Sequence, residues 1–181
     1  MLLAAVLSVA TIVGQPAPDW PRLRWAQGGP LSLAELRGKV VLLRFFTDPE
    51  CPFCSATAPA LNEFDRDFRA RGLVVLGFYT PKPRPRPTRI EDARRTTAAY
   101  GFRFPVAVDD EWKALRRLWL DRNPGAGWTS ASLVIDREGI VRYVHPGGAF
   151  AKNSDDPQSR RDYHEVRATI ETLLARKEVP R

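Results

Sequence analysis

The stretch Glu50-Cys51-Pro52-Phe53-Cys54 follows directly on an apolar run at Val40–Phe46 and decides the fold. Only Arg44 interrupts the run, which predicts a buried central strand of a parallel or mixed sheet. Apolar residues then recur at helical spacing across residues 54–71. Pro52 suits the first helical turn, where a backbone N–H is not needed. We therefore expect both cysteines at the start of a helix, just beyond the end of a buried strand.

Cys51 and Cys54 are the only two cysteines in 181 residues, and they lie three positions apart. This spacing places both thiols on one side of a helix, within disulfide reach. A helix N-terminus favours the thiolate, which is the attacking species in thiol–disulfide exchange. Glu50 puts a negative charge beside Cys51 and opposes this effect. We expect Cys51 to be the exposed nucleophile and Cys54 the resolving thiol, with no bound cofactor.

The remaining pattern predicts short strands and amphipathic helices in alternation. Further strands are expected at residues 23–25, 73–78, 105–108, 132–135 and 140–144, and further helices at 90–100, 112–119 and 163–174. Residues 31–38 are expected to form one helical turn. The order β-β-α-β-α-β-α-β-β-α predicts an α/β fold with helices on both faces of one sheet.

Two segments stand apart from this pattern. Residues 1–14 are almost entirely apolar and resemble a secretory signal, with small residues at Ser8-Val9-Ala10, although no Lys or Arg precedes Arg22. We expect export, with an apolar N-terminal segment of a cytoplasmic protein as the alternative, and one domain over residues 15–181. Residues 81–87 alternate proline with Lys and Arg, which predicts an extended polyproline-II-like loop at the surface.

The chain resembles the thioredoxin-like superfamily, in particular the TlpA-type disulfide reductases and redoxins that neighbour the AhpC/TSA proteins. The resemblance rests on residues 13–19, 33–43, 46–54 and 133–142, and on Pro59, which lies where thioredoxins carry a helix-kinking proline. It implies a thioredoxin fold with an N-terminal extension and an insertion before the C-terminal hairpin. It also implies a redox-active disulfide at Cys51 and Cys54. Glu50, Pro52, Phe53 and Pro59 are expected to be the supporting residues of this active site.

The sequence departs from the thioredoxin pattern in two places. Ser130 occupies the position of the cis-proline that faces the active site, and without proline a cis bond is not expected there. The strand before the cysteines carries Arg44 and no acid, where thioredoxins bury a carboxylate beneath the second cysteine. Trp128, Thr129 and Ser130 are still expected to form the loop that faces the substrate.

A cysteine pair with this spacing has other functions besides disulfide exchange. A peroxidase is the nearest, but Arg44, Asp48 and Ser130 stand where peroxiredoxin motifs require other residues. A Cu(I) metallochaperone would use Cys51, Cys54 and His145, since thiolates suit Cu(I). A zinc site would need His145 and His164 as well, and a structural disulfide closing so small a loop gains little stability.

The expected partners follow from this chemistry. They are a disulfide substrate, either a protein or a small thiol compound, and an upstream thiol protein that donates electrons. The net charge of +7 comes mainly from arginines spread along the chain, and no nucleic-acid-binding motif is visible. Membrane association is expected only through the N-terminal segment, and the protein is expected to be a monomer.

Overall fold

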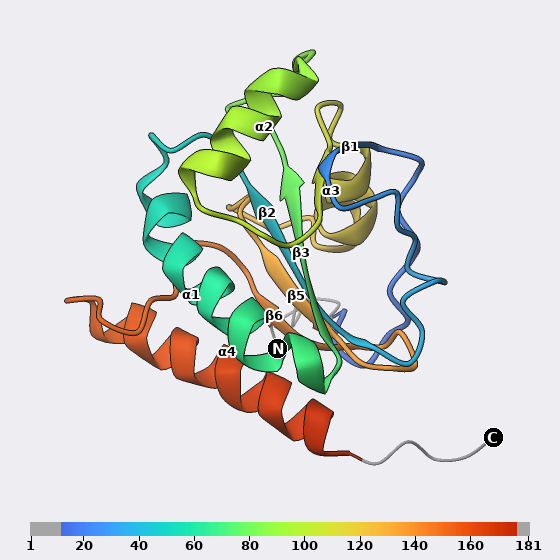
Figure 1. Ribbon diagram of the computed structural model, residues 1–181, viewed down its shortest axis with the longest axis vertical. Coiled ribbons are helices and arrows are strands. Elements are labelled where there is room, and N and C mark those ends of the chain that lie inside the picture. Colours follow the sequence, from blue (N-terminus) through green and yellow to red (C-terminus); the bar gives the residue numbers. More distant parts are fainter. Residues whose placement is uncertain (1–11, 177–181) are drawn as a thin grey trace, which may run out of the picture.

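A computed structural model describes residues 12–176 and contains a six-stranded mixed sheet (Figure 1). The strand order is β1-β4-β3-β2-β5-β6, with β2, β3 and β4 parallel and the other pairs antiparallel. The strands are β1 (Arg24–Gln27), β2 (Val40–Phe46), β3 (Leu73–Tyr79), β4 (Val106–Val108), β5 (Ser132–Ile135) and β6 (Val141–His145). Every residue of β2 is buried, as the apolar run predicts for a central strand.

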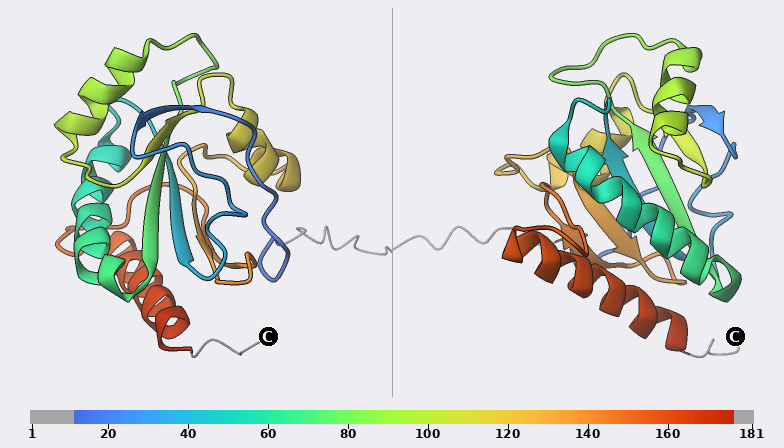
Figure 2. Two further views of the ribbon diagram at one scale, coloured as in Figure 1. Left: turned by 45° about the vertical axis from the view of Figure 1, so that its right-hand side comes forward. Right: turned by 60° about the vertical axis from the view of Figure 1, so that its left-hand side comes forward.

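Helices cover both faces of the sheet (Figure 2). The helices α1 (Pro52–Phe68), α2 (Ile90–Ala99) and α4 (Pro157–Ala175) lie on one side and α3 (Lys113–Leu118) on the other. Short 3₁₀ segments follow α1 at Arg69–Arg71 and α3 at Leu120–Arg122. Each face has its own apolar core, and α1 contributes Leu61, Phe64 and Phe68 to the first of them. Burying one such phenylalanine stabilises the fold by about 1.5–3 kcal/mol.

The predicted order of strands and helices is confirmed, and so is the thioredoxin-type α/β architecture. The helical turn expected at residues 31–38 is wrong. Residues 33–38 form consecutive turns, in which Leu36 N–H donates to Leu33 C=O at 3.2 Å and Arg37 N–H donates to Ala34 C=O at 3.3 Å. These bonds span three residues, so the segment is wound more tightly than an α-helix.

Residues 81–87 form a loop, as predicted, but not one continuous polyproline-II segment. Residues 82–84 are bends, and the bond between Lys82 and Pro83 is cis. Pro81 is buried and accepts a hydrogen bond from the indole of Trp112 at 2.8 Å. The start of the loop is therefore fixed against the protein, whereas Pro83 to Pro87 are exposed.

The N-terminal segment joins the fold beside β6, at the edge of the sheet opposite β1. Of the apolar segment expected at residues 1–14, residues 1–11 lie outside the described range. Ile12 is buried, Gly14 N–H donates to Val141 C=O at 2.8 Å, and Pro16 forms a bridge with Ile140. The described fold thus begins a few residues before the expected boundary at residue 15.

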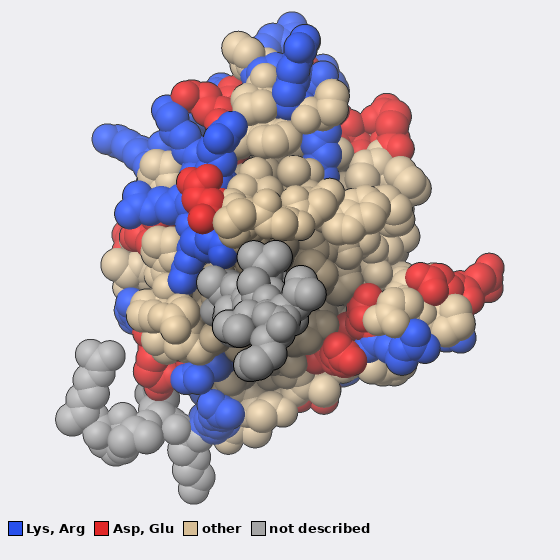
Figure 3. Space-filling model, turned by 180° about the vertical axis from the view of Figure 1, so that it is seen from behind, with Lys and Arg blue, Asp and Glu red and all other residues tan. Residues whose placement is uncertain are grey.

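The surface is charged but mixed in sign. Figure 3 shows Lys and Arg side chains gathered along the upper and left edges of one face, with Asp and Glu among them and uncharged residues across its middle. None of the helices within residues 12–176 is both long and apolar enough to cross a membrane.

Candidate active site

The two cysteines lie at the N-terminus of α1, where the sequence predicts them. Cys51 is the N-cap residue and is half-buried, and its carbonyl accepts hydrogen bonds from the N–H groups of Cys54 at 3.1 Å and Ser55 at 3.0 Å. Cys54 is buried, with 3% of its surface exposed. Both are free thiols, and their side chains interact. Cys51 is therefore the thiol that a partner can reach, and Cys54 is the thiol positioned to attack it from within.

The loop between β2 and Cys51 is held in place by Asp48. Its carboxylate accepts hydrogen bonds from Tyr79 Oη at 2.6 Å and Arg86 Nη2 at 3.3 Å, and its backbone carbonyl accepts one from Cys51 N–H at 3.0 Å. Tyr100 Oη donates to the carbonyl of Asp48 at 2.9 Å. These partners come from β3, the 81–87 loop and the end of α2. Three separate segments therefore fix the position of the nucleophile.

Burial raises the pKa of the Cys54 thiol to about 11, and the Arg44 guanidinium opposes this rise. The interactions with Cys51 raise the pKa further, whereas the hydrogen bond with the backbone of Thr47 lowers it. Arg44 lies on β2, on the same face of the sheet as α1, because it alternates with Phe45, whose side chain packs in the opposite core. In the reduced form, Cys54 is therefore a neutral thiol near neutral pH.

The raised pKa of Cys54 makes the reduced protein sensitive to alkali. The folded state holds this proton more tightly than the unfolded chain does, so the contribution to stability is complete below pH 9 and is lost as the pH rises through about 11. We expect a loss of about 3 kcal/mol across that window. Urea unfolding of reduced protein at pH 8 and pH 11, with Cys54→Ala as the control, measures it. An equal loss in the control would show that Cys54 is not responsible.

Lys82 is a second cation near the cysteines. β3 runs parallel to β2, with Tyr79 beside Phe46 and Thr80 N–H donating to Phe46 C=O at 2.7 Å, so the chain leaving β3 passes the loop that carries Cys51. Lys82 is half-buried there. Burial lowers its pKa, and the charges of Cys54 and Cys51 act in the opposite direction. The start of the 81–87 loop is thus part of the site.

The loop before β5 lies against the helix that carries the cysteines. Trp128 is half exposed, and its ring meets the Phe53 ring edge-on with the centroids 5.3 Å apart. Ser130 is buried, and the bond before it is not among the cis peptide bonds of the described chain. The loop predicted to face a substrate therefore presents an exposed aromatic pair, Phe53 and Trp128, while Thr129 is half-buried beside it.

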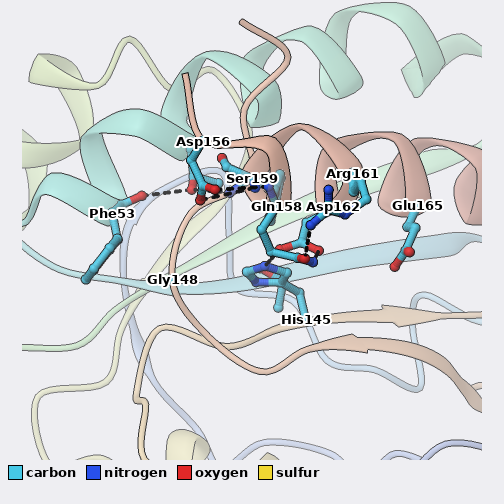
Figure 4. Close-up of polar contacts among 12 residues, drawn as sticks. Phe53, His145, Gly148, Asp156, Gln158, Ser159, Arg161, Asp162 and Glu165 are labelled. Atoms are coloured by element: carbon cyan, nitrogen blue, oxygen red, sulfur yellow. Dashed lines mark hydrogen bonds and ion pairs between the residues drawn. The ribbon is translucent and has the colours of Figure 1, made fainter. Parts of the chain in front are cut away.

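His145 does not join the cysteines, so the proposed Cu(I) site is not formed. Its Nε2 lies 3.1 Å from Asp162 Oδ2 on α4, and Figure 4 shows the two side chains facing each other across the gap between β6 and α4. Within residues 12–176, no three His, Cys, Asp or Glu side chains lie close enough together to hold a metal ion, which also excludes the zinc arrangement there. His164 is exposed on α4. Burial lowers the pKa of His145, and the charge of Arg44 acts in the same direction.

The other expected site residues have simpler surroundings. Pro52 is at the start of α1 and Pro59 is inside it; both are exposed, as is Glu50. The effect of Glu50 on Cys51 and the kink at Pro59 stay predictions.

Three residues of the site were not predicted from the sequence. Asp48 and Lys82 were not expected to be parts of the site, and Arg44 was given no role in it. For Arg44 a signal existed, since a lone charge in an apolar strand requires a buried partner.

Known proteins resemble this chain over most of its length. The sequence model of the AhpC/TSA family matches residues 13–144. Thiol-disulfide oxidoreductase ResA from Bacillus anthracis is 26% identical over 136 residues, which cover 71% of this chain and 66% of ResA. Peroxiredoxin 2 from Thermoplasma acidophilum is 28% identical over 134 residues, 73% of this chain and 65% of that protein.

The chain spans 16% of the length of another curated relative, protein DipZ of Mycobacterium tuberculosis, to which it is 27% identical over 129 residues. Among solved structures, a candidate thiol:disulfide interchange protein DsbE from Chlorobium tepidum superposes with a TM-score of 0.69 at 25% identity. The match covers 90% of this chain and 98% of that one.

Proposed function

The chain belongs to the AhpC/TSA family, and on that premise we propose that it is a thiol–disulfide oxidoreductase that works through Cys51 and Cys54. The observation that carries the proposal is the arrangement of the two thiols in the first turn of α1, one half-buried and the other buried beneath it. A nucleophile at the surface and a second thiol behind it are what a two-step exchange requires.

The exchange follows from this geometry. In the reducing direction, the Cys51 thiolate attacks one sulfur of a partner disulfide, the partner's S–S bond breaks, and its second sulfur leaves as a thiolate. The Cys54 thiolate then attacks Cys51 Sγ in the mixed disulfide. The Cys51–Cys54 bond forms, the bond to the partner breaks, and the partner leaves as its second thiolate. Two electrons pass to the partner, and an upstream thiol protein would return them.

Comparing two substrates tests this function. We expect the protein to reduce insulin disulfides with dithiothreitol as electron donor, at a rate well above its consumption of hydrogen peroxide. The similarity to a peroxiredoxin makes peroxidase activity the alternative. Fast peroxide consumption through a sulfenic acid at Cys51, with slow reduction of insulin, would favour the peroxidase.

The aromatic pair of Phe53 and Trp128 supports a protein as the substrate. Both side chains are exposed and in contact with each other, and Phe53 follows the nucleophile by two residues, so the pair offers apolar contact to the residues that flank a partner's disulfide. Such contact suits an extended or unfolded segment that carries apolar side chains.

Replacing Trp128 with alanine is expected to raise KM for insulin about 5- to 30-fold, because a central aromatic contact contributes about 1–2 kcal/mol to binding. The rate with oxidised glutathione should change less than about 2-fold, since this small polar disulfide has little apolar surface to bury against the ring. Steady-state kinetics with both substrates measures this, and Trp128→Phe is the control that keeps an aromatic face. Equal losses with both substrates would contradict a docking role.

Export of the chain is part of the proposal. A secreted Mycobacterium tuberculosis oxidoreductase and ResA are among the proteins that this chain resembles. The described fold includes the chain from Ile12 onward, so cleavage after Ala10 would keep every residue that the structure describes. N-terminal sequencing of the full-length chain after expression in a bacterium tests this. A mature chain starting at residue 11 supports export, and an intact N-terminus in the cytoplasmic fraction contradicts it.

A further inference from the structure

Arg44 is a fully buried cation on β2. Its side chain has no exposed surface, and within residues 12–176 it forms no ion pair with any Asp or Glu. Nη2 donates to the carbonyl of Gly148 at 2.8 Å and Nη1 donates to Ser132 Oγ at 3.2 Å. Nε has no hydrogen-bond partner in this range, and Cζ lies 5.6 Å from the centroid of the Phe150 ring. Burying a charge in this way is costly unless an anion compensates it.

The cysteines are the groups whose ionised forms would compensate the charge of Arg44. Burial lowers the pKa of Arg44, and the charge of Cys54 is the largest influence that acts against the effect of burial, followed by that of Cys51. The neighbouring His145 cannot serve, because its charge has the same sign when it is protonated and its pKa is lowered by burial and by Arg44. A thiolate at Cys54 is therefore the anion that would balance the buried charge of Arg44.

We propose that Arg44 is the charge partner of the Cys54 thiolate while the mixed disulfide is resolved. It takes the place of the carboxylate that thioredoxins bury beneath the second cysteine. This rests on the proposed function. The Cys54 thiol loses its proton to solvent or to the departing thiolate, and the guanidinium stabilises the resulting anion until Cys54 Sγ bonds to Cys51 Sγ. Arg44 keeps its own protons throughout, so it positions and stabilises charge and transfers none.

The mixed disulfide strengthens this role. In the free dithiol, the charge and hydrogen bonding of Cys51 raise the pKa of Cys54. Once Cys51 is bonded to a partner it carries no charge, so of these influences only burial, Arg44 and the backbone of Thr47 remain. Lys82 from the 81–87 loop, Tyr100 from the end of α2 and His145 from β6 are the other titratable groups around this pocket. The charge of Arg44 is the largest influence that lowers the pKa of Cys54.

Ellman's reagent separates the two steps. Attack by Cys51 releases the first nitrothiobenzoate and leaves the second on Cys51, and attack by Cys54 releases the second. In Arg44→Met, the midpoint of the pH profile of the second release should rise by about 1–3 units. At pH 7 this release should slow about 3- to 30-fold, since a thiolate of higher pKa is also a better nucleophile. The first release should change much less. Arg44→Lys should restore most of the second rate, and Arg66→Met, at an exposed arginine of α1, is the control for net charge.

Three results would overturn the role of Arg44: an unchanged pH profile in Arg44→Met, equal slowing of both releases, or no recovery in folded Arg44→Lys. A wild-type protein that never releases the second nitrothiobenzoate would contradict the proposed function itself.

If Arg44→Met does not fold, an NMR titration of the Cys51→Ala protein tests the same pairing with Arg44 still in place. Its Nε–H resonance should shift with the same pKa as the Cys54 Cβ resonance; an Nε–H resonance that does not follow Cys54 would contradict the pairing.

Discussion

Replacing Cys51 with serine is expected to reduce the rate of insulin reduction on the order of 10³-fold or more, because a hydroxyl at this position supplies no thiolate. Cys51 is the partly exposed thiol of the pair, and the buried Cys54 cannot be reached by a protein disulfide without opening of the fold. The loss should appear in kcat/KM for protein and small disulfides alike.

Ser55 provides the matched control for this change. It follows Cys54 in the first turn of α1, is exposed, and donates a hydrogen bond to the carbonyl of Pro49 at 2.7 Å. Ser55→Ala should leave kcat/KM within about 3-fold of wild type, since it takes part in neither exchange step. Substantial activity in Cys51→Ser would show that Cys54 can act alone and would contradict the assignment of roles.

Replacing Cys54 with serine is expected to trap the partner. Cys51 still attacks the disulfide, but no second thiol is present to displace the partner, so the mixed disulfide should persist at least about 100-fold longer than in wild type. Reaction with an oxidised protein substrate, followed by non-reducing electrophoresis and mass spectrometry, detects the covalent complex at Cys51. Cys51→Ser should form no such complex. A complex that clears as quickly in Cys54→Ser as in wild type would mean that another group resolves it.

Much of the fold was predictable because its signals are local. The apolar run of β2, the helical spacing of α1 and the hairpin of β5 and β6 each follow from residues close together in sequence, and the structure confirms all three. The turns at residues 33–38 were mistaken for a helical turn because the two share apolar spacing and a terminal glycine. Their difference lies in which carbonyl each N–H reaches.

The site was predictable only in part, for the same reason. The cysteines and the Trp128 loop follow from motif and position, whereas the contacts around them join distant residues. Asp48 receives hydrogen bonds from Tyr79 and Arg86, 31 and 38 residues away, and nothing in its own neighbourhood indicates this. Arg44 was visible as an anomaly in β2. Strand alternation alone places it on one of two faces, and only the contacts with Gly148 and Phe150, together with the packing of α1, show that it lies on the face covered by the helix that carries Cys54.

The strand β2 carries Arg44, and no Asp or Glu, on the face that α1 covers, and this has one consequence for the chemistry. In a site with a buried carboxylate, proton transfer would accompany resolution, whereas here the fixed positive charge stabilises the anion once the proton has left. The pH dependence of resolution should therefore report the titration of Cys54, with no separate carboxylate step at acidic pH.

The most direct test of the account is the redox state of the cysteine pair. Wild-type protein is equilibrated with a series of reduced and oxidised glutathione ratios, quenched in acid, alkylated and analysed by mass spectrometry. We predict a disulfide linking Cys51 to Cys54 that forms and disappears reversibly as the ratio changes, with a single midpoint. Two thiols that stay fully alkylatable across the series, or a pair that goes directly to sulfinic acid without a disulfide, would contradict the assignment of Cys51 and Cys54 as the redox centre.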